Sequence, residues 1–215
     1  MKLSDLNDLF LHELKDVYDA EHQLLKALPR MAKAASATEL QQAFEEHLAQ
    51  TEQQVERLES VFEACGEEPK REPCTGMKGL IAEGERLMKE NAEPDVMDAG
   101  LIAAAQRVEH YEIAAYGTLV AWAGTAGIDG AAELLQATLD EEKMTDRKLS
   151  AIAQSNVNVD AETSDDEMEE EDEAAAARRS RQRSRSGSQQ RPSGGRNAGR
   201  QRTRSRKARS SRARR

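Results

Sequence analysis

Hydrophobic residues return every three or four positions along four long stretches of the chain, which predicts four long amphipathic helices. A shorter stretch of the same kind follows a proline-containing loop between the second and the third. Glycine or proline stands near several of the expected ends. The long helices are expected at about 4–35, 36–66, 95–123 and 129–154, and the short one at about 77–91.

Two local signals refine these expectations. Ser36 and Glu39 have the spacing of a capping box, in which both side chains accept backbone N–H groups at the start of a helix. Pro29 falls inside the first helix, where it has no N–H to donate, so it should kink or loosen that helix.

The order of these elements predicts the fold class. Two long helices, a crossover with a short helix, and two more long helices are typical of the ferritin-like arrangement among helical bundles. Aromatic residues make up only 3% of the 215 residues, which favours helices over a β-sandwich. We therefore predict that residues 1–155 form an all-α, ferritin-like four-helix bundle with one long crossover.

Polar residues interrupt the apolar stripe of each long helix. In the segment VEHYEIAAY (108–116), Glu109 and Glu112 share a helix face with Ala105 and Tyr116. The other three helices carry one or two such interruptions each. The six polar residues are Glu21, His47, Glu109, Glu112, Glu142 and Asp146.

These six residues suggest a metal site. An ionised carboxylate is rarely buried without compensation, because removing its water is costly, and no lysine or arginine shares these stripes. A pair of iron or manganese ions would neutralise them, since carboxylates together with imidazole suit these metals. The alternative is that the carboxylates reach water at the edge of the bundle. His12, His22 and His110 fall off the stripes and are expected at the surface. The three tyrosines are expected in core or edge packing rather than as redox relays, except that Tyr116 lies one turn beyond Glu112 and is a candidate for contact with the site.

The chain holds two cysteines, Cys65 and Cys74, on either side of a loop. A disulfide across this loop is one alternative, but two reduced thiols in a cytoplasmic protein are the favoured interpretation, because no secretory segment precedes the first helix. No apolar stretch approaches the ~20 residues that a membrane-spanning helix needs.

Charge divides the remainder of the chain into two blocks. Residues 160–173 contain 10 acidic and no basic residues, whereas residues 178–215 contain 15 Arg and 1 Lys and no acidic residue. We predict an acidic disordered linker at 156–177 and a basic disordered tail at 178–215, since neither can bury a core. The net charge of −9 at pH 7 conceals this contrast.

Arginine pairs with phosphate, so the basic tail is expected to bind nucleic acid. It contains no aromatic residue for stacking on bases, which predicts binding without sequence specificity. The alternative is that the tail folds back on the acidic block or on the acidic bundle. The residues expected to contact phosphates are Arg178, Arg179, Arg181, Arg183, Arg185, Arg200, Arg202, Arg204, Arg206, Lys207 and Arg209.

Several segments occur in the order typical of one bacterial family: LFLHELKDVYDAEHQLLKALPRMAKAA, FEEHLAQTEQQVERLE, CTGMKGLIAEGERL, VEHYEIAAYGTL and LDEEKMTDRKL. Over about residues 3–155 the chain resembles the YciF/YciE family of stress proteins. The resemblance implies a rubrerythrin-like four-helix bundle, a homodimer, a role in stress, and a metal site at the six positions above. Rubrerythrins and ferritins have Glu-x-x-His on the second helix, whereas here Phe44 precedes His47 by three residues. The fourth helix has Asp146 where a histidine is expected, so one metal position is predicted to lack ligands.

Three functions therefore remain open. The first is a ferritin-like stress protein that binds iron or manganese and carries a nucleic-acid-binding tail. The second is a metal-free, dimeric helical interaction module whose tail carries the function. The third is an oxidoreductase, which requires turnover of oxygen or peroxide by bound iron.

Overall fold

The part of the chain that the structure describes is all-α, as the periodicity predicts. The structure, a computed structural model, describes residues 3–163, except for the side chain of residue 129. The helices are α1 (Leu6–Ala34), α2 (Thr38–Ala64), α3 (Thr75–Leu87), α4 (Pro94–Ala126) and α5 (Asp129–Ile152), followed by the short π-helix η1 (Ala153–Val157). Helix α1 continues through Pro29. The basic tail and most of the acidic linker lie outside the described residues.

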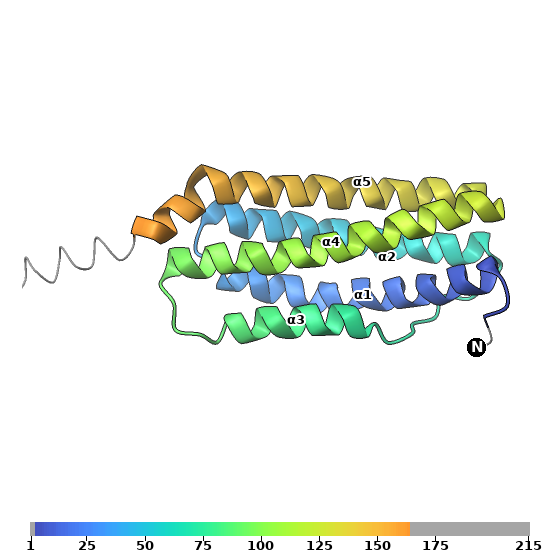
Figure 1. Cartoon of the computed structure of the whole chain (residues 1–215), viewed down its shortest axis with the longest axis horizontal. Helices are drawn as coiled ribbons and strands as arrows, with labels where there is room; N and C mark the ends of the chain where they lie inside the picture. Colours follow the sequence, from blue (N-terminus) through green and yellow to red (C-terminus); the bar gives the residue numbers. More distant parts are fainter. Residues whose placement is uncertain (1–2, 164–215) are drawn as a thin grey trace, which may run out of the picture. The chain divides into compact units, whose positions relative to one another are not determined.

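The four long helices pack as a bundle in which α1 and α2, α2 and α5, α5 and α4, and α4 and α1 are neighbours. The crossover carries α3 back along the bundle, so α4 begins at the same end as α2 (Figure 1). Helix α3 packs against α1 and α4 on the outside of the bundle. This topology is the ferritin-like bundle with one long connection that the sequence predicts.

The helical run continues further than predicted. Residues 153–157 form η1 and residues 158–163 are again helical, so residues 156–163 of the predicted linker are ordered as helix. The reason is Val157, which is buried against the bundle core beside Ile152. Val157 is buried but Val159 is exposed, so the few apolar residues of this segment give too weak a periodic signal to predict the extension.

The core is divided into two halves. In α1, Phe10, Leu14 and Val17 belong to the half beside the α4–α5 turn, whereas Leu24 and Leu28 belong to the half beside the α1–α2 turn. The other three long helices are divided in the same way. Between the halves lies a layer of buried polar side chains, so the apolar stripes of all four helices are interrupted at the same height.

The start of α2 is capped differently from the prediction. Its N-cap is Ala37, and neither Ser36 nor Glu39 makes the expected capping-box hydrogen bonds. Instead the buried carboxylate of Asp98, from α4, accepts the backbone N–H groups of Ser36 at 2.8 Å and Ala37 at 2.6 Å. A carboxylate from a neighbouring helix thus replaces the local cap, so the predicted capping box is wrong.

The crossover is attached to α1 through Asp19. Its carboxylate accepts the backbone N–H of Cys74 at 2.8 Å, the Gln23 amide at 2.7 Å and the Arg71 guanidinium at 2.7 and 2.8 Å. The Cys74 thiol lies 3.0 Å from the Tyr111 hydroxyl, which donates to Asp16 at 2.7 Å. Both cysteines are free thiols, in agreement with the favoured interpretation. These contacts link α1, the crossover and α4.

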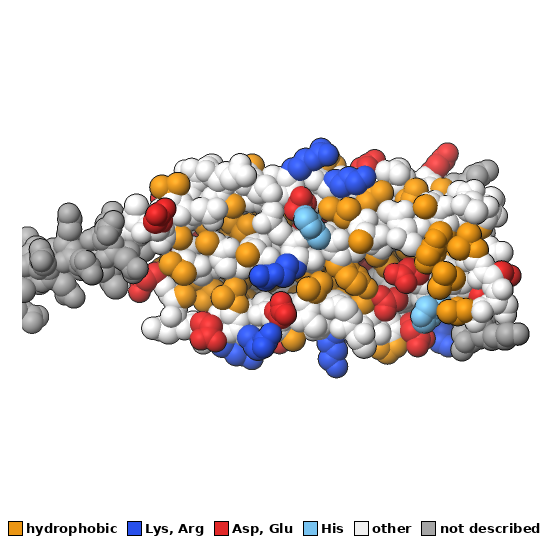
Figure 2. Space-filling model, in the orientation of Figure 1, with side chains coloured by type: hydrophobic (Ala, Val, Ile, Leu, Met, Phe, Trp, Pro, Cys, Tyr) orange, Lys and Arg blue, Asp and Glu red, His pale blue; other side chains and the backbone are white. Residues whose placement is uncertain are grey.

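The surface shows no single dominant feature on the face in view. Acidic, basic and hydrophobic side chains are interspersed along it (Figure 2). Among the described residues, no helix is long and apolar enough to span a membrane.

Candidate metal centre

The polar layer contains five ionisable side chains that expose no more than 2% of their surface: Glu21 from α1, His47 from α2, Glu109 and Glu112 from α4, and Glu142 from α5. All four long helices contribute to it. The sequence-based alternative, in which these carboxylates reach water at the bundle edge, is therefore wrong for these residues.

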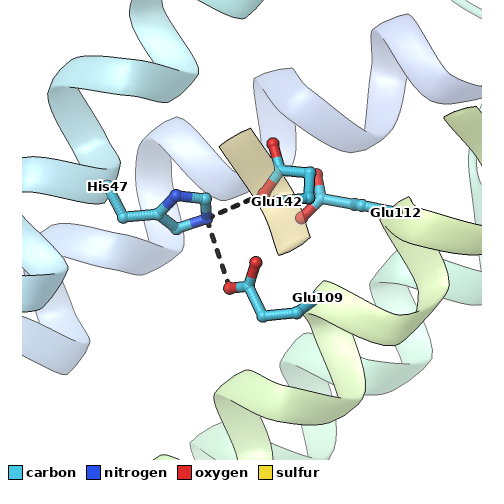
Figure 3. Close-up of side chains that lie close together, drawn as sticks. All are labelled: His47, Glu109, Glu112 and Glu142. Carbon is cyan, nitrogen blue, oxygen red and sulfur yellow. Dashed lines mark ion pairs between the residues drawn. The ribbon is translucent and has the colours of Figure 1, made fainter. Parts of the chain in front are cut away.

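Four of these side chains point toward one another (Figure 3). One ligand atom each from His47, Glu109, Glu112 and Glu142 lies within 4.8 Å of the other three. The Nε2 atom of His47 is 3.4 Å from Oε1 of Glu109 and 3.9 Å from Oε2 of Glu142. Glu109 and Glu112 reach the same point because residues three apart share a helix face.

Glu21 belongs to the same layer but has a hydrogen-bonding partner of its own. The hydroxyl of Tyr116, which is fully buried, donates to Oε1 of Glu21 at 2.5 Å. Glu21 and Glu112 also interact with each other, and each carboxyl affects the pKa of the other. The sequence singles out Tyr116 among the tyrosines because it lies one turn beyond Glu112, and the structure shows that its hydroxyl contacts the layer.

Gln54, on α2, is a member of the layer that the sequence analysis missed. It is fully buried, and its amide nitrogen donates to Oε1 of Glu142 and, at 3.1 Å, to Oε2 of Glu141. The Arg57 guanidinium pairs with Glu141 at 2.9 Å and donates to Thr138 at 2.6 Å. Gln54 follows His47 by two helical turns, so the heptad spacing was the signal that could have identified it.

Asp146 lies at the edge of the layer, outside the close group. Its side chain is 23% exposed, and its Oδ1 is 3.3 Å from Nε2 of His110 and 3.4 Å from the Gln106 amide. His110 and His12 are exposed, as predicted, whereas His22 is half-buried against the Tyr18 ring. A ligand role for Asp146 stays a prediction.

Burial changes the protonation of every group in the layer. Desolvation raises the pKa of Glu21 to about 8 and of Glu142 to about 7, and raises those of Glu109 and Glu112 well above 4.5. It lowers the pKa of His47 to about 4, so this imidazole is neutral at pH 7 and has a lone pair available for a metal. Without a cation, the layer therefore holds protons on its carboxyl groups.

The layer also contains an excess of unsatisfied polar atoms. Buried polar side-chain atoms normally have hydrogen-bonding partners. Within residues 3–163, all the buried side-chain nitrogen and oxygen atoms without one are in this layer: Glu21 Oε2, His47 Nδ1 and Nε2, Gln54 Oε1, Glu109 Oε2, both oxygens of Glu112, and Glu142 Oε2. A metal cation is the partner that fits their chemistry, because most of these atoms are carboxylate oxygens and imidazole nitrogens.

Comparison with known proteins agrees with the fold. The family model described as "domain of unknown function (DUF892)" matches residues 5–162. The protein YciF of Escherichia coli is 47% identical over 159 residues, which are 74% of this chain and 96% of that protein.

Solved structures agree as well. The crystal structure of the E. coli stress protein YciF superposes with a TM-score of 0.70 and covers 72% of this chain and 98% of that one. YcfI from Rhodopseudomonas palustris has 44% identity and a TM-score of 0.68, and covers 69% of this chain and 95% of that one. A protein from Xanthomonas campestris, 20% identical, matches in fold alone, with a TM-score of 0.56 over 73% of this chain and 95% of that one.

Proposed function

The chain belongs to the DUF892 family, and from the chemistry of its polar layer we propose that it binds iron or manganese in the bundle and nucleic acid through its basic tail. One observation supports the metal-binding part above the others. The unsatisfied buried polar atoms of the described chain are all gathered in one layer, where carboxylate oxygens and a neutral imidazole face each other.

The residues that would hold the metal are His47, Glu109, Glu112 and Glu142, with Glu21 beside them. A bound iron or manganese ion would supply Lewis-acid and one-electron redox chemistry at this layer. The protein side chains fix its surroundings: Gln54 orients Glu142, Tyr116 orients Glu21, and the two core halves exclude water from both sides.

The test is the metal content of the full chain, purified without chelator and then offered ferrous iron anaerobically or manganese. We expect metal near stoichiometry in the parent and its loss from Glu109→Gln and Glu142→Gln. Glu52→Gln, on the exposed face of α2, is the control that should retain the metal. Absence of metal from the parent under all these conditions would instead support the metal-free interaction module.

The second part of the proposal rests on the basic block of the sequence. Residues 178–215 carry 15 Arg and 1 Lys, and polyanionic phosphate is the partner that such charge attracts. The E. coli relative is described as a stress protein. We propose a role of this kind for the present chain, in the cytoplasm, with metal binding and nucleic-acid binding carried by one chain.

Salt dependence tests the tail. The affinity of the full chain for duplex DNA should fall steeply with salt, and changing Arg200, Arg202, Arg204 and Arg206 to Gln should reduce the slope of log K against log salt by roughly 3–4. The matched control changes Arg107 and Arg147, which are exposed on the bundle, and should leave the slope unaltered. An unaltered slope in the tail variant would place the contact elsewhere.

A further inference from the structure

We infer that the polar layer holds one metal ion per chain, bound by His47, Glu109, Glu112 and Glu142, rather than the pair of ions that the ferritin-like arrangement suggests. This inference rests on the proposed metal binding and specifies how many ions the layer takes. It follows from the partners that the structure gives to the remaining polar groups.

The four close residues suit a single ion. Metal–oxygen and metal–nitrogen bonds are about 2.0–2.2 Å long, so two ligand atoms of one ion lie no more than about 4.4 Å apart. The four ligand atoms already lie within 4.8 Å of one another without an ion. Small side-chain movements are therefore enough to close them around one cation. The group includes both carboxylates and an imidazole, so a single ion would have a mixed oxygen and nitrogen environment.

A second ion would have to be held largely by Glu21. One oxygen of Glu21 accepts the Tyr116 hydroxyl, which leaves only Oε2 without a partner. The two carboxylates that influence the pKa of Glu21, those of Glu142 and Glu112, both already belong to the close group. Glu21 thus offers one free oxygen and no imidazole.

The second helix supplies a neutral amide rather than an additional charge. Gln54 directs its NH₂ group at Glu142 and Glu141, where it acts as a donor to carboxylates. The NH₂ group is a donor that orients Glu142 and cannot bind a metal. The amide Oε1 of Gln54, which has no partner, is neutral and adds no negative charge to balance a second ion. The position three residues before His47, where the ferritin-like pattern has a glutamate, holds Phe44, which is buried in the apolar core.

The fourth helix does not complete a second position either. Asp146 contacts His110 and Gln106 at the edge of the bundle, and its side chain is 23% exposed. Its interactions lie on the solvent side of the layer. A second ion would therefore lack both the second-helix carboxylate and the fourth-helix ligand.

The experiment loads the full chain with Mn²⁺, removes loosely held ions by dialysis against metal-free buffer, and measures Mn per chain together with the electron paramagnetic resonance spectrum. We expect one ion per chain and the spectrum of isolated Mn²⁺. Two ions per chain with an exchange-coupled spectrum would overturn the inference and leave the proposed metal binding intact. No bound Mn²⁺ and no bound iron would overturn the proposed function itself.

Three variants sharpen the result. Gln54→Glu should raise the stoichiometry toward two, because it adds a buried second-helix carboxylate beside Glu142, whereas Gln53→Glu on the exposed face of the same helix should leave it at one. Asp146→Asn should retain the full single equivalent of Mn²⁺. Loss of the ion from Asp146→Asn would overturn the inference, and this arm stands even if Gln54→Glu fails to fold.

Discussion

At single residues, burial decides which groups are reactive. Burial, followed by the hydrogen bond with Asp16, raises the pKa of the Cys74 thiol to about 11. Cys65 is half-buried, and its pKa is raised as well, by burial and then by Glu67. Both thiols therefore carry little thiolate at neutral pH, and their reactivities should differ mainly because Cys74 is less accessible to solvent than Cys65.

We expect Cys74 to be alkylated by iodoacetamide at least about 10-fold more slowly than Cys65 in the folded protein at pH 8, because the Cys74 side chain is buried and holds its proton more tightly. Mass spectrometry of the Cys65→Ser and Cys74→Ser variants measures each thiol separately. Equal alkylation rates for Cys65 and Cys74 in the folded protein would contradict the expected protection of Cys74. Alkylation in denaturant is the control and should equalise the two.

The pKa of the Asp19 carboxyl is lowered, whereas those of the two thiols are raised. Burial alone would raise its pKa, but the hydrogen bonds from the Cys74 N–H, Gln23 and Arg71 outweigh burial and leave the pKa below 3.8. Its contribution to stability is therefore present above about pH 4 and is lost as the pH falls through the folded-state pKa.

Asp19→Asn should lower the free energy of unfolding by about 1–3 kcal/mol at pH 7, because the buried N–H of Cys74 and the Arg71 guanidinium lose a charged acceptor. The difference from the parent should shrink below pH 4. Asp140→Asn, an exposed carboxylate on α5, should change stability by less than about 0.5 kcal/mol. Urea unfolding at pH 7 and pH 3.5 gives both values, and a pH-independent difference would exclude the electrostatic explanation.

At the scale of whole helices, the start of α2 distinguishes a cap predicted from neighbouring residues from a cap supplied by another helix. The sequence predicts that Ser36 caps this helix, whereas the structure assigns the cap to Asp98 of α4. A carboxylate that accepts the first N–H groups of a helix satisfies donors that the helix leaves unpaired. The two assignments predict different effects of mutation on stability.

Asp98→Ala should destabilise the protein by about 0.5–2 kcal/mol or more, since a fully buried carboxylate with two N–H partners is removed. Ser36→Ala should change stability by a few tenths of a kcal/mol at most. Thermal unfolding followed by circular dichroism measures both. A larger loss from Ser36→Ala than from Asp98→Ala would restore the capping box.

For the molecule as a whole, the polar layer couples folding to protonation. Between pH 6.5 and 8 an unfolded glutamate is ionised, whereas the folded layer keeps protons because burial raises its carboxyl pKa values. The folded state binds more protons in this window, so the stability of the metal-free protein falls as pH rises. His47 opposes this only in the lower part of the window, because an unfolded histidine with a pKa of about 6.5 still loses protons there, whereas buried His47 is neutral throughout.

We therefore expect the melting temperature of the metal-free protein, kept in chelator, to fall from pH 6.5 to pH 8. The free energy of unfolding should fall by roughly 1 kcal/mol or more per pH unit. Glu112→Gln should be more stable than the parent at pH 8 without metal, and its stability should depend less on pH. Calorimetry with a chelator, and again with Mn²⁺, measures the effect. Bound metal should flatten the pH dependence, and a melting temperature that stays level in the chelated parent would contradict the raised pKa values.

Much of the architecture is determined by the sequence itself. Hydrophobic spacing predicts four long helices, a crossover and their order, because a 3.6-residue repeat is local information that any long amphipathic helix displays. The same spacing shows Glu21, His47, Glu109, Glu112 and Glu142 interrupting the stripes, and all five are buried in one layer.

Only the tertiary structure decided how these groups are used. Asp146 follows Glu142 by four residues, which is one turn of α5 plus a further rotation of about 40°. At that angle its side chain is 23% exposed and contacts His110. The roles of Gln54, Tyr116 and Asp98 depend on partners 61 to 95 positions away in the chain. Helical periodicity carries no information about which helix faces which, so contacts between helices had to come from the packing.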